Sequence, residues 1–273
     1  ASLLCLGVTR PYASGIGGGG FMTIHMAKTK TNDFINFREM APAASTADMF
    51  DNDYQKSVAG GLSVAVPGEI AGLWEAHQTY GKAPWASLFT ESIKLARDGF
   101  ELDKLFQMRL EQNRDAIMKS PSLRNLLTKV SEDGQIVLLA AGDVLKRPGL
   151  AHTLEKVALS GPSAFYEGSV AEAIVNQIQH DGGILTLDDM KNFKAERMLR
   201  DQSPLLTMAN LTSRYQDYYV VTGPPPSSGV LINFMLNVLD DLLVDMPLDP
   251  FNYAQKYHFI IEALKFGFTH RMS

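Results

Sequence analysis

A run of five glycines within six positions, Gly15 to Gly20, constrains this chain more than any other stretch. Glycine has no Cβ, so such a run lets another backbone or a ligand approach more closely than other residues permit. A phosphate-binding loop would need Lys-Ser or Lys-Thr after the last glycine, at the start of a helix. Here Phe21 and Met22 follow and begin a strand-like segment, the reverse of the order in a dinucleotide-binding motif. The pattern therefore favours close packing over phosphate binding.

The composition is that of an ordinary globular protein. The chain has 273 residues, 45% apolar and 20% charged, which suffices for one large or two small domains with a sizeable core. Its net charge of −5, without a basic stripe, argues against nucleic acid as a partner. Cys5 is the single cysteine, so no internal disulfide can form, and its apolar neighbours predict an inert core thiol.

Both ends of the sequence have the pattern of helices cut short. Residues 1–8 are predicted to be the last turns of a helix, and the apolar helix pattern at the other end stops with the sequence. The first apolar run is much shorter than the roughly 20 residues that span a bilayer, and it lacks the charged front of a signal peptide. We therefore expect a fragment of a longer protein, truncated at both ends.

Periodicity predicts mostly helices with a minority of strands. Phe21–Met26 and Phe34–Arg38 are predicted to form a hairpin, because both are strand-like and a turn-rich stretch separates them. A helix is expected to begin at Pro67 and to end at Gly81, and a second helix covers about residues 86–98. The predicted fold class is α+β, with a single domain over residues 1–273.

Capping patterns mark three later helices. Ser169 and Glu172 are predicted to form a capping box, and Thr186 with Asp189 repeats that pattern. After the proline run, Ser227 or Ser228 is the expected N-cap of another amphipathic helix.

No metal or cofactor site is predicted, and no nucleophile stands out. His258 and Glu262 are four residues apart on one predicted helix face, but a lone pair at this spacing is more often a packing or surface contact than a metal site. No serine lies in a nucleophile-elbow pattern. Ser63 and Thr269 are the nucleophiles to consider if the chain were active by itself.

Arg38 is the charge of greatest interest. It ends a predicted strand in "INFREMAP", so its guanidinium is expected at the margin of a core. The pattern alone favours an ion pair with Glu39 or another acid. The alternative is a planar fork that binds a substrate carboxylate through two parallel hydrogen bonds.

Several stretches together resemble the γ-glutamyltransferase (glutathione hydrolase) family. They occur in the family's order and cover most of the chain: "SGIGGGGFMTIH", "INFREMAP", "GGLSVAVPGEIAGLWEAHQTYGKAPW", "SIKLARDGF", "AFYEGSVAEAIVNQIQHDGGILTLDDMKNF", "PPPSSGVLINFMLNVL" and "YHFIIEALKFGFTHR". "SVAVPGE" and "GGILTLDDM" are specific to it, whereas residues 101–140 match only loosely.

The resemblance implies an Ntn-hydrolase fold, a four-layer αββα sandwich made as a precursor that cuts itself into two subunits. The new N-terminal threonine of the small subunit is both nucleophile and, through its own amine, base. It attacks the γ-amide of glutathione or a related γ-glutamyl compound, and water, an amino acid or a dipeptide releases the acyl group. No cofactor is implied.

The chain departs from the family pattern because it contains no threonine-led segment that matches the cleavage site. It resembles the large subunit, so no catalytic residue is assigned within it and the chain alone is expected to be inactive. Arg38 matches the family arginine that binds the substrate α-carboxylate, and Glu39 would be its orienting neighbour. The glycine run would then provide packing room at the start of a central strand, beside the γ-glutamyl pocket.

Partners and location also follow from the resemblance. The expected partners are the small subunit of the same precursor, a γ-glutamyl donor and an amino-acid or dipeptide acceptor. A eukaryotic member would lie outside the cell, anchored upstream or secreted, and a bacterial one in the periplasm. Asn210 heads a glycosylation sequon, which mildly favours a eukaryotic exterior. The alternative is a non-catalytic, truncated paralogue that binds another protein through the surface the small subunit would cover.

Overall fold

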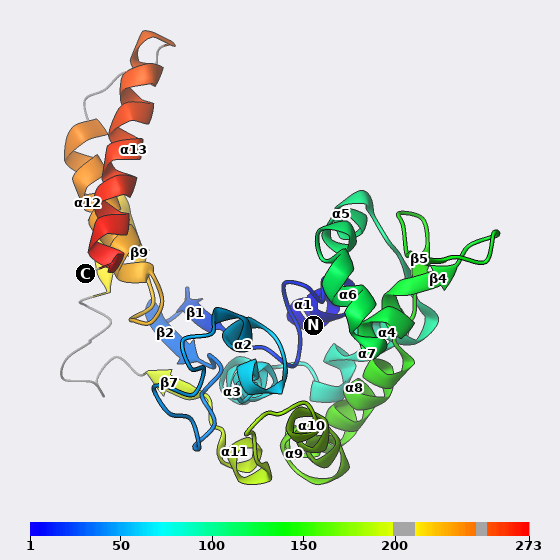
Figure 1. Ribbon diagram of the computed structural model, residues 1–273. Coiled ribbons are helices and arrows are strands. Elements are labelled where there is room, and N and C mark those ends of the chain that lie inside the picture. The colour runs from blue at the N-terminus through cyan, green and yellow to red at the C-terminus, as the bar shows by residue number, and fades with distance from the viewer. Residues whose placement is uncertain (199–210, 244–249, 273) are drawn as a thin grey trace. The chain divides into compact units, whose positions relative to one another are not determined.

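The computed structural model describes residues 1–198, 211–243 and 250–272. These residues form two compact units (Figure 1). The first comprises Ala1–Gly19 and Arg38–Lys194, and the second comprises Gly20–Phe37 and the chain from Ala195 onward. Whether the chain folds as the single domain expected from its sequence stays a prediction.

The first unit is mainly helical. Its helices are α1 (Ser2–Thr9), α2 (Tyr54–Val58), α3 (Glu69–Tyr80), α4 (Thr90–Asp98), α5 (Lys104–Gln112), α6 (Arg114–Lys119), α7 (Pro121–Leu127), α8 (Pro148–Ser160), α9 (Ser163–Tyr166), α10 (Gly168–His180) and α11 (Leu187–Asn192), with 3-10 turns at Gly61–Ser63 and Trp85–Leu88. Its short strands pair antiparallel as β3 (Phe100–Glu101) with β6 (Val144–Leu145) and β4 (Thr128–Val130) with β5 (Ile136–Leu138).

Packing of α4 against α8 forms the centre of this unit (Figure 1). Ala151, Leu154 and Ala158 recur along α8 at helical spacing and are buried, so this face of α8 lies in the core. Ala96 of α4 is fully buried in the same cluster. The Trp85 indole completes the contact by donating a hydrogen bond to the Val157 carbonyl at 3.0 Å.

Helix α1 is fixed at its C-terminal end by a half-buried arginine, Arg147. Arg147 Nη1 donates to the carbonyls of Gly7 and Val8 at 2.9 and 3.4 Å. The Arg147 amide also donates to the Ala96 carbonyl at 2.7 Å, so one residue joins α1 to the end of α4. A cation suits this position because the last carbonyls of a helix carry partial negative charge. Burial nevertheless lowers the pKa of Arg147.

The second unit contains a three-stranded antiparallel sheet in the order β1 (Phe21–Met26), β2 (Thr31–Asn36), β7 (Glu196–Met198). In β2, Phe34 and Ile35 are buried together with Asp33, whose carboxylate accepts from Arg197 of β7 at 2.6 Å. A second hairpin joins β8 (Thr212–Tyr215) to β9 (Tyr218–Val221).

Two long helices complete the second unit. Figure 1 shows α12 (Gly229–Leu243) and α13 (Pro250–Met272) running side by side. Large apolar side chains on both helices are exposed: Val230, Ile232, Leu242, Tyr253, Tyr257, Ile261, Leu264, Phe266 and Phe268. In the part of the chain that the structure describes, no helix is both long and apolar enough to cross a membrane.

Several sequence predictions are confirmed. A helix occurs at Ser2–Thr9 as expected, α3 ends before Gly81, and α4 ends at Asp98. Helix α4 begins at Thr90, four residues later than predicted, because Trp85–Leu88 forms a 3-10 turn. Thr186 and Asp189 form the predicted capping box. At the start of α12, Ser227 Oγ accepts from the Gly229 amide at 3.3 Å, which confirms a serine cap.

Other predictions are wrong in detail. Strand β2 begins at Thr31 and ends at Asn36, because the hairpin pairs Phe21 with Asn36 and Met26 with Thr31, so Arg38 lies beyond the strand. β2 is the middle strand of the described sheet, and β1 lies at its edge. Whether β1 is a central strand of the two-subunit fold stays a prediction. Helix α3 begins at Glu69, two residues after Pro67.

The Ser169 capping box is also wrong. Helix α10 begins at Gly168, two residues earlier than predicted, with Glu167 as N-cap and no side-chain cap. Ser169 therefore lies inside the helix, where its hydroxyl accepts from Lys156 Nζ at 3.1 Å.

Substitution of Arg147 tests the junction of α1 and α4. We expect Arg147→Gln to lower the free energy of unfolding by about 1–3 kcal/mol, because the Gly7 and Val8 carbonyls lose their charged donor. Urea denaturation followed by circular dichroism measures the change, with Arg124→Gln on the exposed side of α7 as the matched control. Equal stability of the two variants would show that these bonds do not hold α1.

Candidate functional site

The candidate site is built around Arg38, which follows the hairpin. Its Nε lies 3.3 Å from Glu39 Oε2, so the ion pair that the pattern predicted is confirmed. The Arg38 side chain is 61% exposed, whereas that of Glu39 is 26% exposed. Glu39 therefore lies largely against the protein, whereas the Arg38 guanidinium reaches solvent, where it can contact an anionic group.

The glycine loop lies against Glu39. A Cβ at Gly18 would stand only 3.3 Å from the Gly15 carbonyl oxygen and 3.4 Å from Glu39 Oε1. On the other side of the loop, a Cβ at Gly7 in α1 would stand 2.9 Å from the Gly15 Cα. The loop therefore serves close packing against a helix and a carboxylate, as the sequence indicated.

The N-terminus of α3 holds the glycine loop. The amides of Gly68 and Glu69 both donate to the Gly18 carbonyl, at 2.8 and 2.9 Å, and the Gly18 amide donates to the Gly15 carbonyl at 2.9 Å. The first amides of a helix have no partner within the helix, so they are available to bind a carbonyl of another segment. One turn of the loop is in this way fixed to the helix.

Glu69 is the buried acid of the site, with 4% of the residue exposed. Its Oε1 is buried without a hydrogen-bond partner. Burial raises its pKa from 4.5 to about 7, and the negative charge of Glu39 adds to the rise. The Gly15 backbone opposes this rise of the pKa, because its N–H dipole favours the ionised form.

Tyr166 stabilises the start of α3 through its hydroxyl group. Its hydroxyl donates to the Pro67 carbonyl at 2.9 Å and accepts from the Ala71 amide at 3.3 Å. Burial raises the pKa of Tyr166. The phenol thus remains neutral at physiological pH and can serve both bonds.

A short backbone bridge connects the Arg38 segment to α3. The Met40 amide donates to the Val66 carbonyl at 3.3 Å, and the Val66 amide donates to the Met40 carbonyl at 2.8 Å. The residues after Arg38 are therefore tied to the residues before α3. Arg38, Glu39, the glycine loop and Glu69 form one connected group, which we call the anchor cluster.

Several other residues singled out in the sequence have partners away from the anchor cluster. Glu262 pairs with Lys265 at 2.8 Å, and Thr269 Oγ1 donates to the Lys265 carbonyl at 2.9 Å within α13. Ser63 Oγ donates to the Gly60 carbonyl at 2.8 Å, and Cys5 Sγ lies 3.2 Å from Ser92 Oγ. Asn210 lies outside the described residues.

Over residues 1–198, 211–243 and 250–272, no group of three or more His, Cys, Asp or Glu side chains is placed to hold a metal.

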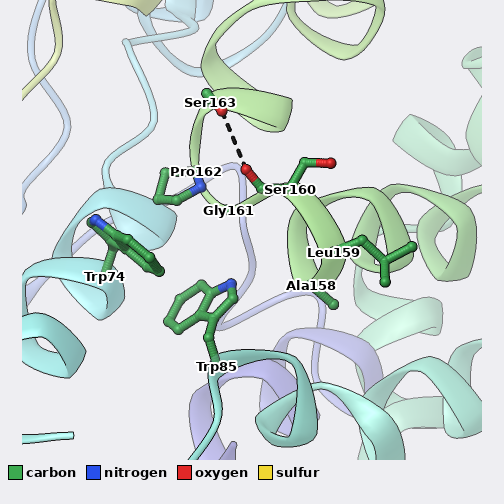
Figure 2. A pocket seen from close by; sticks show the side chains of 8 residues that line it. All are labelled: Trp74, Trp85, Ala158, Leu159, Ser160, Gly161, Pro162 and Ser163. Atoms are coloured by element: carbon green, nitrogen blue, oxygen red, sulfur yellow. Dashed lines mark hydrogen bonds between the residues drawn. The ribbon is translucent and has the colours of Figure 1, made fainter.

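A hollow of about 620 Å³ lies elsewhere in the first unit. Figure 2 shows Trp74 and Trp85 on one side of it, and on the other the residues from the end of α8 to the start of α9, Ala158–Ser163. No titratable side chain lines it, and no residue of the anchor cluster does. The residues that line the hollow therefore include no acid or base that could transfer a proton in a reaction.

Sequence reasoning found Arg38, Glu39 and the glycines of this cluster but missed Glu69 and Tyr166. Glu69 was recognised only as an acid suited to a helix start. The one available signal was that Glu69 is an acid in a largely apolar stretch. The sequence could not show the burial of Glu69, because the residues that cover it, the glycine loop and Tyr166, are distant in the chain.

Comparison with known proteins gives consistent matches over the whole chain. Residues 1–273 match the family model described as gamma-glutamyltranspeptidase. The chain is 41% identical to Scoloptoxin SSD14 of Scolopendra dehaani and 36% identical to Glutathione hydrolase 3 of Arabidopsis thaliana. It covers 45% and 40% of these two proteins, and 99% and 100% of its own length is matched.

A solved structure is similar too. The match to Helicobacter pylori gamma-glutamyltranspeptidase has a TM-score of 0.85 at 28% identity and covers 98% of this chain and 74% of that one. The chain thus spans less than half the length of the curated relatives named above.

Alanine at Gly7 tests the contact between α1 and the loop. In an ordinary helix interior, Gly→Ala adds roughly 1 kcal/mol of stability. At Gly7 we expect a loss of about 1–3 kcal/mol instead, because the new methyl group would displace the Gly15 backbone. Gly17→Ala is the control, since nothing lies within 4 Å of a Cβ there. Thermal unfolding of both variants measures the effect, and a more stable Gly7→Ala protein would contradict it.

The raised pKa of Glu69 predicts a pH dependence of stability. The folded protein holds the Glu69 proton up to about pH 7, whereas the unfolded chain releases it near pH 4.5. The free energy of unfolding should therefore fall by about 3 kcal/mol as pH rises through this window, at about 1.4 kcal/mol per pH unit. Glu69→Gln should remove this component, as measured by the difference between the two urea-denaturation series across the window. Parallel series would contradict a raised pKa.

Proposed function

Because the chain belongs to the gamma-glutamyltranspeptidase family, we propose that it is the large-subunit portion of a γ-glutamyltransferase or glutathione hydrolase. Its fold is part of the Ntn-hydrolase fold of that family, helix-rich with few strands, as the sequence predicted. The proposed activity is cleavage of a γ-glutamyl amide and transfer of the γ-glutamyl group to water, an amino acid or a dipeptide.

The anchor cluster is the observation that carries this proposal. Arg38 stands at an exposed position with its Nε 3.3 Å from Glu39 Oε2, and its planar group suits a carboxylate. In the proposed reaction Arg38 binds the α-carboxylate of the donor, and Glu39 orients the guanidinium. This fixes one end of the substrate so that its γ-carbonyl has a defined position.

The chemical step belongs to the partner subunit in this proposal. The hydroxyl oxygen of its N-terminal threonine forms a bond to the γ-carbonyl carbon, and its proton passes through the threonine's own amine to the departing amine. The acyl-enzyme is then released by water or by an acceptor amine. The contribution of this chain is positioning, which lowers the barrier by holding the reacting atoms in reach.

The exposed apolar side chains of α12 and α13 support a partner subunit. Soluble proteins rarely leave so many large apolar groups uncovered without a binding role. The proposed partner is the small subunit of the same precursor. The proposal also places the protein outside the cytoplasm, at the outer face of the plasma membrane or secreted in a eukaryote, and in the periplasm in a bacterium.

Arg38→Lys tests the proposed role in the full-length protein. Lysine keeps the charge and loses the planar fork, so we expect a KM for γ-glutamyl-p-nitroanilide raised by the equivalent of about 2–5 kcal/mol. The fall in kcat should be smaller, and cleavage into two subunits should proceed because it needs no external substrate. Enzyme kinetics and gel electrophoresis measure these effects.

Arg97→Lys is the matched control, because Arg97 pairs with Glu155 on the α4–α8 surface. If Arg38 serves only its pair with Glu39, Arg38→Lys would lower the melting temperature slightly and leave KM near wild type. That result would remove the assignment of Arg38 and favour the alternative of a non-catalytic binding protein.

A further inference from the structure

Tyr166 buries a hydroxyl group at the start of another helix. The residue is 7% exposed, and its ring stacks on Phe193 with 5.9 Å between the ring centroids. Its hydroxyl donates to the Pro67 carbonyl at 2.9 Å and accepts from the Ala71 amide at 3.3 Å. A buried hydroxyl group costs stability unless it is hydrogen-bonded, so these two bonds are what tyrosine offers over phenylalanine at this position.

We propose that Tyr166 is a positioning residue for the carboxylate anchor: its hydroxyl group holds the backbone just before α3, and this backbone in turn holds the main chain that carries Arg38. The inference rests on the proposed function, in which Arg38 binds the donor α-carboxylate.

The first step is the cap that Tyr166 supplies to α3. The N-cap residue, Gly68, has no side chain and makes no side-chain cap. The Ala71 amide in the first turn therefore needs an acceptor from another part of the chain, and the Tyr166 hydroxyl is that acceptor. The same hydroxyl donates its proton to the Pro67 carbonyl, one residue before the N-cap. One phenol thus fixes the backbone on both sides of the helix start.

The second step is the hold of Pro67 on its neighbour. Val66 and Pro67 are both buried, so their backbone polar groups need partners within the protein. Val66 exchanges two hydrogen bonds with Met40, at 2.8 and 3.3 Å. Pro67 has no N–H, and Tyr166 is the donor to its carbonyl. Loss of the hydroxyl group leaves this carbonyl buried without that donor, next to the residue that binds Met40.

The third step leads from Val66 to the anchor. Met40 lies two residues after Arg38, so its pair of bonds to Val66 ties the main chain of the anchor to the start of α3. A second tie lies farther from Arg38, where the Ala43 amide donates to Asp189 Oδ1 at 2.8 Å. Movement of Val66 should therefore displace the Arg38 end of the segment more than the Ala43 end. The link passes through the main chain, so it holds whichever groups the guanidinium contacts.

Tyr166→Phe tests the link in the full-length protein, because it removes the hydroxyl group and keeps the ring. We expect the KM for γ-glutamyl-p-nitroanilide to rise about tenfold with a smaller change in kcat, since a displaced anchor weakens binding of the ground state and the transition state alike.

Trp85→Phe is the matched control. It removes a bond of the same kind in the same unit, from Trp85 Nε1 to the Val157 carbonyl at 3.0 Å. Both variants should have a lower melting temperature, and Trp85→Phe should keep a KM near wild type. A KM that rises equally in both variants would show that it follows stability alone, which would overturn the inference.

Hydrogen exchange measures the link without turnover. In Tyr166→Phe the amides of Met40 and Val66 should exchange about tenfold faster than in the wild type, because their mutual bonds open more often once the Pro67 carbonyl is not held. In Trp85→Phe both amides should exchange as in the wild type. Unchanged exchange of these amides in Tyr166→Phe would overturn the inference.

A double-mutant cycle separates this inference from the function on which it rests. If Tyr166 acts through Arg38, Tyr166→Phe should raise KM in the wild type and hardly raise it further in Arg38→Lys. Additive effects of the two substitutions on KM would overturn the inference and leave the proposed function standing. If Arg38→Lys alone leaves KM unchanged, the proposed function fails, and amide exchange still decides whether Tyr166 holds the segment.

Discussion

The rest of the candidate site depends on the hydrogen bonds between the glycine loop and the N-terminus of α3. The Gly68 and Glu69 amides converge on the Gly18 carbonyl, at 2.8 and 2.9 Å. The helix start thereby gains partners for amides that would otherwise need water or a cap. The loop gains a fixed shape, although its glycines give it more backbone freedom than any other sequence would.

This arrangement explains why glycine is needed at two positions around the loop. At Gly7 of α1, a methyl group would stand only 2.9 Å from the Gly15 Cα. At Gly18, a Cβ would stand 3.3 Å from the Gly15 carbonyl oxygen and would touch Glu39 Oε1 at 3.4 Å. A helix and an ion pair can therefore lie against opposite sides of one short turn. The cost is the burial of Glu69, which raises its pKa to about 7.

How far the sequence predicts this site depends on the range of each interaction. The glycine run, the hairpin and the Arg38–Glu39 pair were predictable because each is decided by residues adjacent or nearly adjacent in the chain. The ends of the strands were less predictable than their presence. Arg38 falls outside β2 because the pairing register of the hairpin ends the strand at Asn36, and the strand propensity of the local residues does not determine that register. Tyr166 could not be predicted, since its bonds to Pro67 and Ala71 cross 99 and 95 residues of chain.

The ion pair and the substrate anchor, which the sequence presents as rival roles for Arg38, are compatible in the structure. A guanidinium has three nitrogens, so a group that contacts Glu39 through Nε can also bind a carboxylate. A long side chain that is 61% exposed loses rotamer freedom when it binds a ligand, and this ordering costs affinity. The Glu39 side chain is only 26% exposed, so its ion pair with Arg38 limits that freedom before a ligand arrives. An exposed arginine beside a largely covered acid therefore suits the anchoring of a carboxylate better than an exposed arginine on its own.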